Sequence, residues 1–385
     1  MFYLIVLLPF ALFFNIINYL ITFFLIIEIY LLLISNTKTL EDNYQISLRD
    51  KNNNNASLIY VFIKFTNRKY FLDVISSMEE NLKLYNNTYN YFNDIDIICY
   101  CSKNYIYYDK KEFLKEEEYH YKFYIDKRNM KIYTYIKHEY IGGAYLLSLF
   151  YTILKEEQKE LHKIFPKSSF LNLFLVPKLF FECKNIPKIE HDLCNLVEDK
   201  KEIRRYKNNY ILTKIDNVST KTIIIYNLLC TLHKSLKLQR SIVCYLPIAF
   251  QHRQNIKNNI GIMWLVFDPS KESLEDLDKK INKSKYQALA TNSLILYKNN
   301  NIKKGSEIRR GVDVVITIML GKENNNFEVS WTFENVSEYP IYAAITSIMR
   351  ENEIHVTQTL TVCTKRFEIN DKNFKFVNFK EYKIE

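Results

Sequence analysis

The feature that most limits how this chain can fold is an unbroken apolar run at its start. Residues 2–34 contain a single charged side chain, Glu28. About 20 consecutive apolar residues cross a bilayer as a helix, and this run is longer by about a dozen. It also lacks the charged start and short apolar core of a cleavable signal peptide. We therefore expect residues 1–36 to form a retained transmembrane anchor, as one tilted helix or as a short hairpin broken near Pro9 or Asn15. We expect the membrane to be that of the endoplasmic reticulum.

The rest of the chain has the pattern of a mixed α/β (α+β) protein. A polar linker at residues 37–57 is followed by two halves, at 58–200 and 201–385. Apolar residues that alternate with polar ones, or short apolar runs, predict strands, and apolar residues at helical spacing predict helices. The clearest predicted strands are 58–63, 94–100, 131–138, 241–249, 261–267, 314–319, 327–333 and 355–362. The clearest predicted helices are 72–84, 145–154, 222–235 and 271–289. Residues 170–181 stay unassigned, because Pro177 would break a helix there.

Charge and cysteine content exclude several classes of protein. The formal net charge is +10, but the 53 Lys and Arg are scattered among 43 acidic residues without an aromatic-interleaved basic stripe. We therefore expect no nucleic-acid partner. Cys99 and Cys101 share one face of a predicted strand, and no second Cys or His pair follows at zinc spacing, so we expect no metal site and no disulfide framework. Gly321 and Lys322 lack the preceding glycine of a phosphate-binding loop.

An adjacent pair of glycines marks the segment that best fits a chemical role. The chain has only six glycines, and Gly142 and Gly143 lie together between a predicted strand and a predicted buried helix. Such a pair indicates a backbone conformation or a close approach that other residues do not allow. His138 ends the apolar face of that strand. A histidine there can act as a general base, since its pKa lies near neutrality, or it can be a structural residue at a strand end.

Residues 119–154 resemble the central motif of the chloramphenicol acetyltransferase-like acyltransferase superfamily. That group includes condensation domains, the plant BAHD acyltransferases and the wax ester synthase/diacylglycerol acyltransferases. Its motif is HHxxxDG, in which the second His is the catalytic base. The match places His138 at the base and Gly143 at the motif glycine, so both are candidate catalytic residues. Lys137 replaces the first His, and Gly142 replaces the Asp that holds the loop through a salt bridge in the family.

Two later stretches extend the resemblance over most of residues 58–365. Residues 217–235 are similar to a family helix, and residues 241–261 to the strand and turn after it. The positions that match in the second stretch are Pro247, Arg253, Asn259 and Gly261. The motif and cofactor-binding candidates are Gly142, His252, Arg253 and Asn259. The BAHD motif DFGWG is absent, which argues against that branch.

The resemblance implies two similar subdomains, each a mixed sheet with flanking helices, and a tunnel between them. Acyl-CoA would be the co-substrate, with no cofactor bound permanently. His138 would take the proton from an acceptor hydroxyl or amine as that atom attacks the thioester. Ser330 and Thr332 in the second half are the candidate donors to the oxyanion, and ordinary polar positions on a half-buried strand are the alternative.

These observations predict a membrane-anchored acyltransferase with a lipid or alcohol acceptor, because an apolar acceptor can diffuse to the protein within the membrane. The missing Asp at Gly142 keeps a second interpretation open, namely a catalytically inactive acyltransferase-like protein that binds or scaffolds at a membrane. A structural membrane protein unrelated to the superfamily is the third. The sequence predicts no particular oligomeric state.

Overall fold

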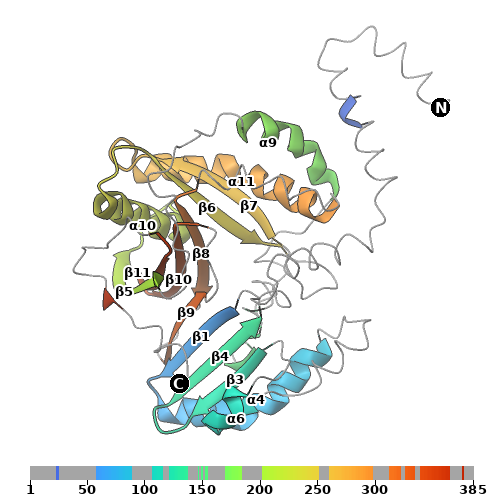
Figure 1. Cartoon of the computed structure of the whole chain (residues 1–385), viewed down its shortest axis with the longest axis vertical. Coiled ribbons are helices and arrows are strands. Elements are labelled where there is room, and N and C mark those ends of the chain that lie inside the picture. The colour runs from blue at the N-terminus through green and yellow to red at the C-terminus, as the bar shows by residue number, and fades with distance from the viewer. Residues whose placement is uncertain are drawn as a thin grey trace, which may run out of the picture.

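The protein forms a mixed α/β structure with two sheets in the part of the chain that the computed structural model describes (Figure 1). The described residues are 23–25, 58–88, 106–115, 121–137, 146, 149–150, 152–154, 170–183, 202–250, 260–297, 312–321, 326–333, 339–364 and 375–376. One sheet has five strands in the order β2-β3-β4-β1-β9. The other has seven in the order β12-β5-β11-β10-β8-β6-β7. The predicted mixed α/β class is confirmed.

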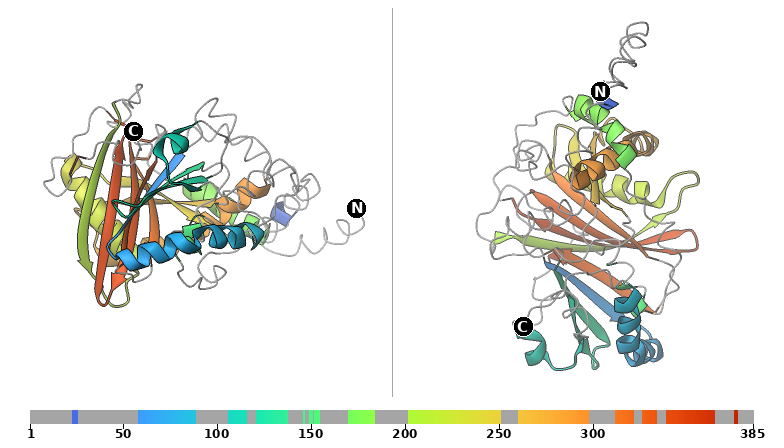
Figure 2. Two further views of the ribbon diagram at one scale, coloured as in Figure 1. Left: turned by 90° about the horizontal axis from the view of Figure 1, so that it is seen from below. Right: turned by 90° about the vertical axis from the view of Figure 1, so that its right-hand side faces the viewer.

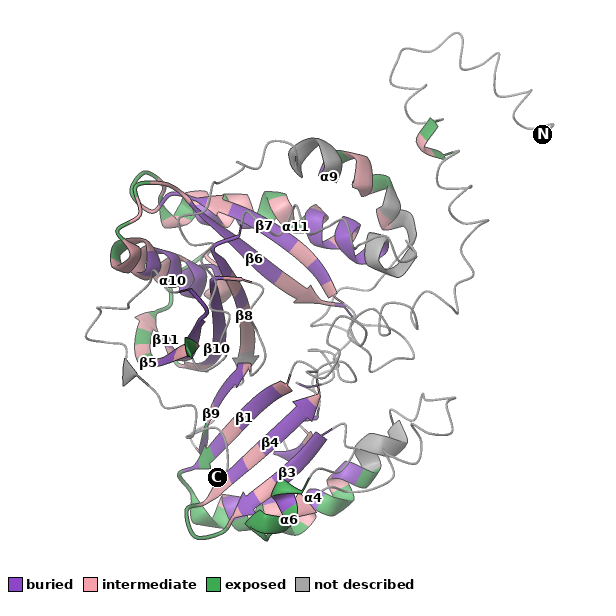
Figure 3. Ribbon diagram, in the orientation of Figure 1, coloured by how far each residue is buried: buried purple, intermediate pink, exposed green. Residues whose placement is uncertain are grey.

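The five-stranded sheet has one helix packed on each of its faces. Its elements are β1 (Leu58–Phe65), α4 (Arg68–Thr88), β2 (Ile106–Tyr107), α6 (Lys110–Leu114), β3 (Tyr121–Asp126), β4 (Lys131–Lys137) and β9 (Phe327–Phe333). Along α4 the side chains at helical spacing, including Phe71, Val74 and Met78, are fully buried against alternate residues of β1 and β4. The outer side of α4 is exposed (Figure 3). This division is that of an amphipathic helix on a sheet.

The seven-stranded sheet has helices packed on both of its faces. Its strands are β5 (Arg204–Thr213), β6 (Ile242–Ala249), β7 (Ile260–Phe267), β8 (Val314–Gly321), β10 (Ile341–Arg350), β11 (Glu353–Val362) and β12 (Lys375–Phe376). Its helices are η1 (Phe170–Leu175), α9 (Val176–Cys183), α10 (Thr220–Leu236) and α11 (Leu274–Tyr297). Ser219 caps α10 as its N-cap residue, because its Oγ accepts a hydrogen bond from the backbone N–H of Thr222 at 3.1 Å. This bond satisfies one of the N–H groups in the first turn that have no partner within the helix.

Strand β9 belongs to the second half of the sequence but lies in the five-stranded sheet, whose other strands come from the first half. It follows strand β8 in sequence, yet it pairs with β1, with Thr332 opposite Tyr60 and Ser330 opposite Phe62. Figure 1 shows this strand beside β1. The predicted boundary at residues 200 and 201 lies outside the described residues. Because of β9, however, the second half of the sequence supplies a strand to the first sheet.

Side chains of α11 cover the free edge of β7. The backbone N–H of Ile262 donates to Thr291 Oγ1 at 2.7 Å, and that of Trp264 donates to Gln287 Oε1 at 2.9 Å. These bonds use backbone groups of β7 that no neighbouring strand reaches. An edge strand closed in this way offers no template for pairing with another chain.

An ion pair with a buried carboxylate ties the start of β6 to the start of β8. Both guanidinium nitrogens of Arg240 lie 2.8 Å from the carboxylate oxygens of Asp313. The same carboxylate accepts the backbone N–H of Val243 at 2.9 Å, and Asp313 is fully buried. The bidentate geometry and the extra hydrogen bond satisfy the buried charge.

None of the helices among the described residues is long and apolar enough to cross a membrane. Of the predicted anchor, only Phe23–Leu25 are described, and they are helical. The predicted strand at 94–100 also lies outside the described residues.

We expect Lys221→Met to stabilise the protein at pH 7 and to lose most of that advantage near pH 10. Burial on α10 lowers the pKa of Lys221 to about 8, and Lys285 on α11 lowers it further in the same direction. The folded state therefore disfavours the charged lysine, and this cost is fully present below pH 8. It is relieved as the pH rises from about 8 to the unfolded-state pKa of about 10.4. The expected gain at pH 7 is on the order of 1 kcal/mol.

Urea unfolding at pH 7 and pH 10 measures this difference. Lys279→Met is the control, because Lys279 is an exposed residue of α11. An equal gain at both pH values for Lys221→Met would show that the charge of Lys221 costs the folded state nothing.

Candidate functional site

Most of the predicted site residues lie outside the described part of the chain. They are His138, Gly142, Gly143, His252, Arg253 and Asn259. Their roles stay predictions. The structure does describe β4, which precedes His138, and β6 and β7, which precede and follow residues 251–259.

Strand β4 leads directly into the segment of His138. Its last residue, Lys137, pairs with Leu58 at the start of β1. Ile132 and Ile136 are fully buried on the face that packs against α4. The alternation of the sequence predicts that His138 lies on this face. Leu146, a helical residue after the glycine pair, belongs to the same core cluster. The strand and the helical residues on the two sides of the motif therefore pack in one core.

The end of β6 reaches that same core. Ala249, the last residue of β6, packs against the cluster that contains Ile136, and so does Met319 of β8. Ala344 of β10 belongs to the cluster itself. The two sheets therefore meet at this cluster, which has contributions from the ends of β4 and β6. Both predicted site segments, the one after β4 and the one after β6, start from this junction.

The two candidate oxyanion donors lie on the other face of the first sheet. Ser330 and Thr332 point to the same side as Tyr60 and Tyr135, opposite to the side of Ile136. Thr332 is fully buried, and its Oγ1 lies 3.3 Å from Thr361 Oγ1 of β11. In the structure Thr332 thus joins β9 to the second sheet. The oxyanion role of both residues stays a prediction, and the structure does not bring them to the face predicted for the base.

The Ser330 hydroxyl is buried and has no hydrogen-bond partner among the described residues. Thr346 of β10 is a second such hydroxyl, and the sequence did not single it out. Thr346 pairs with Met319 and follows two residues after Ala344, so it lies on the inner face of the second sheet, next to the junction. A buried hydroxyl without a partner costs free energy. Thr346 is therefore an additional candidate for a polar contact at this junction.

Strand β9 is held to the second sheet by two further hydrogen bonds. Trp331 Nε1 donates to the backbone O of Ile345 at 3.3 Å, and Arg205 Nη2 donates to the backbone O of Phe333 at 3.2 Å. Trp331 also packs in the first sheet's core. The position of one sheet relative to the other thus depends on β9.

We expect Trp331→Phe to destabilise the protein by about 1 kcal/mol more than Trp264→Phe does, because only the first change removes a hydrogen bond between the sheets. The two tryptophans are matched, since both are buried and Trp264 Nε1 has no hydrogen-bond partner among the described residues. Urea midpoints of the two variants give the comparison. Equal losses would mean that the bond from Trp331 Nε1 to Ile345 contributes nothing.

Two buried cysteines near these strands are unsuited to nucleophilic chemistry. Burial raises the pKa of Cys363 to about 12, against the opposing effect of Arg205, and burial also raises the pKa of Cys244. Both thiols therefore stay protonated near neutral pH. Within the described ranges no three His, Cys, Asp or Glu residues gather as metal ligands.

Comparisons with known proteins address the fold. No protein-family model matches the sequence, and no curated protein is significantly similar to it. A mutant starter condensation domain of rhizomide synthetase RzmA, in complex with C8-CoA, has a similar structure, with a TM-score of 0.51 at 8% identity. The match covers 82% of this chain and 87% of that chain. Polyketide synthase associated protein 5 from Mycobacterium tuberculosis gives a TM-score of 0.47 at 10% identity, over 84% of this chain and 92% of that chain.

The RzmA domain and this chain share a fold over most of the chain's length. The likeness is one of fold, since only 8% of the aligned residues are identical. The chain therefore has the two-sheet fold of the condensation domains, which are members of the chloramphenicol acetyltransferase-like superfamily.

Proposed function

We propose that this protein is an acyltransferase that moves an acyl group from acyl-CoA to a hydroxyl or amine acceptor, with His138 as the general base. The observation that carries the proposal is the junction of the two sheets. The strand end that leads to His138 and the strand end that leads to His252 and Arg253 both reach one core cluster, through Ile136 and Ala249. Two substrates can meet at such a junction, where each half supplies residues to bind them.

The similar condensation domain supports acyl-CoA as the donor. That protein was crystallised with C8-CoA. For this chain, we propose that Arg253 and His252 contact a phosphate of CoA, since a guanidinium pairs well with phosphate oxygens. Asn259 and Gly142 are the remaining motif positions in the proposed site.

The proposed chemistry is a single acyl transfer. His138 accepts the proton from the acceptor O–H or N–H as the oxygen or nitrogen attacks the thioester carbonyl. A tetrahedral oxyanion forms, and hydrogen-bond donors must stabilise it. The C–S bond then breaks, and the departing CoA sulfur takes the proton from His138. Ser330 and Thr332 remain the candidate donors from the sequence, and the buried hydroxyl of Thr346 is the alternative from the inner face of the second sheet.

The apolar run at residues 2–34 supports a membrane location and an apolar acceptor. We propose that this run anchors the protein in the endoplasmic reticulum membrane, where a lipid or a long-chain alcohol reaches the site by diffusion in the bilayer.

Incubation of the detergent-purified protein with radiolabelled acyl-CoAs of several chain lengths and a lipid extract tests the proposal. We expect labelled acyl groups to appear in a new ester or amide that chromatography separates from free fatty acid. Release of free fatty acid alone would indicate thioester hydrolysis without an acceptor. If neither product forms with any acyl-CoA, acyl transfer is excluded and the inactive binding or scaffolding protein is the better account.

A further inference from the structure

Segment η1–α9, residues 170–183, is a helical stretch with almost no polar residues. Its sequence, FLNLFLVPKLFFEC, contains four phenylalanines, and its only charged residues are Lys178 and Glu182. A helix on the surface of a globular protein normally has a broad polar face. This segment lacks one in its sequence, because its polar residues are only Asn172, Lys178 and Glu182.

One side of η1–α9 packs against the second sheet and α11. Leu179 is buried in a cluster with Tyr245 and Trp264, and Leu175 and Val176 pack against that cluster. This contact accounts for three of the apolar residues and fixes the segment on the flank of the domain.

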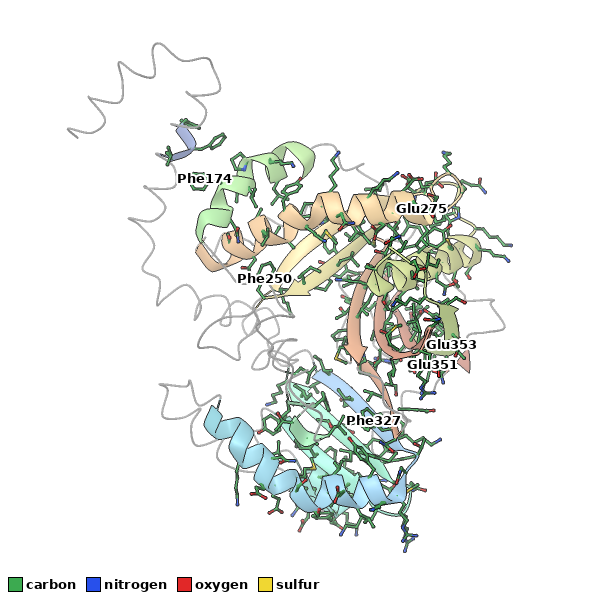
Figure 4. All side chains as sticks on the ribbon, turned by 180° about the vertical axis from the view of Figure 1, so that it is seen from behind. Phe174, Phe250, Glu275, Phe327, Glu351 and Glu353 are labelled. Atoms are coloured by element: carbon green, nitrogen blue, oxygen red, sulfur yellow. The ribbon has the colours of Figure 1, made fainter. Side chains whose placement is uncertain are left out.

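The other side of η1–α9 presents apolar and basic groups to the surroundings. The side chain of Phe174, labelled in Figure 4, is 43% exposed. Pro177 is half-buried, and Lys178 is exposed with its Nζ 4.1 Å from the ring centre of Tyr286. An exposed aromatic ring beside a lysine is the chemistry of helices that lie in the headgroup region of a bilayer.

A second exposed apolar segment lies at the same end of the molecule. Phe23 and Leu25 are 58% and 41% exposed, and they belong to the apolar run at residues 2–34. Figures 1 and 2 place residues 23–25 at the end of the molecule that carries α9. Two exposed apolar segments, about 150 residues apart in sequence, thus share one side of the protein.

We propose that η1–α9 is a membrane-contact surface whose partner is the lipid bilayer itself. Phe174 enters the boundary between headgroups and acyl chains, and Lys178 lies among the headgroups, where anionic lipids attract it. The inference goes beyond the proposed anchor, because it adds a second contact that fixes how the folded part sits on the membrane. It does not depend on acyl transfer.

Tryptophan quenching by brominated lipids tests this surface in the full-length protein. Phe174→Trp is the reporter, and Leu72→Trp is its control, since Leu72 is 52% exposed on α4, in the other half of the fold. The native Trp264 and Trp331 are buried and contribute equally to every sample. Each protein is reconstituted into phosphatidylcholine–phosphatidylglycerol vesicles with and without dibromo-phosphatidylcholine. Flotation of the vesicles shows that the protein is bound.

We expect Phe174→Trp to lose emission in brominated vesicles relative to the wild type, and Leu72→Trp to match the wild type. Flotation without extra quenching of Phe174→Trp overturns the membrane-contact surface and leaves the anchor standing. If the wild type does not float with the vesicles, both the membrane-contact surface and the N-terminal anchor are overturned. Emission of Phe174→Trp that shifts with protein concentration in detergent, without quenching by lipid, would assign the surface to a second copy of the chain instead. Acyl transfer measured on the same samples keeps the enzyme proposal separate.

Discussion

Gly261→Ala is expected to cost at least about 3 kcal/mol of folding free energy, and to leave little folded protein if the chain is marginally stable. A β-carbon at residue 261 would lie 2.0 Å from the backbone O of Ala288 and 2.8 Å from Phe250 Cε2. The first contact is with the backbone of α11, which cannot rotate away as a side chain can. To admit the methyl group, α11 must move off β7, and its side-chain bonds to the edge of β7 would then break.

The urea midpoint of the purified variant measures this loss, and the yield of folded protein gives a second reading. Asn209→Ala is the control, because Asn209 is an exposed residue on β5 and its change should stay within about 0.5 kcal/mol of the wild type. A Gly261→Ala protein as stable as the control would show that α11 does not approach β7 so closely.

The spacing of apolar residues in the sequence correctly predicted strands and helices that have one apolar face and one polar face. The strand at β1 and the one at β4 have apolar residues on the α4 face, so their sequence periodicity is visible. Helix α10 was predicted at residues 222–235 from its apolar spacing and runs over Thr220–Leu236, with Ser219 as its N-cap residue.

One strand without such a contrast was missed. Strand β10, Ile341–Arg350, has seven buried residues in succession, since β8 and β11 flank it and both of its faces are covered. Its sequence therefore lacks the alternation that marks a half-buried strand. Residues 170–181 were left unassigned because of Pro177, but α9 begins at Val176. Pro177 thus lies in the first turn of α9, where a missing N–H costs nothing.

The pairing of β9 with β1 of the first half could not be predicted from the spacing of apolar residues. Residues 327–333 were predicted as a strand, but nothing in their alternation says which sheet they join. The face assignment of Ser330 and Thr332 depends on the register with β1, which only the structure gives. Their choice as oxyanion donors used sequence position alone, and the register places them on the face opposite to Ile136.

His138→Ala is the second large effect that we expect, on the rate of acyl transfer. A general base contributes about 10²–10⁴-fold, so the variant should lose activity by that factor while it still binds acyl-CoA. Stability should change little, because the core faces that flank this position, including Ile136, stay intact. His355→Ala is the matched control. His355 lies on β11 with its Nε2 3.0 Å from Glu353 Oε2, and neither residue belongs to the proposed site.

The most direct test compares the initial rates of acyl transfer by the wild type, His138→Ala and His355→Ala. The rates are measured at saturating acyl-CoA, with the acceptor found in the lipid-extract assay. We predict that His355→Ala keeps the wild-type rate, whereas His138→Ala falls about 10²–10⁴-fold with an unchanged dissociation constant for acyl-CoA. Full transfer activity in His138→Ala would contradict the assignment of His138 as the general base.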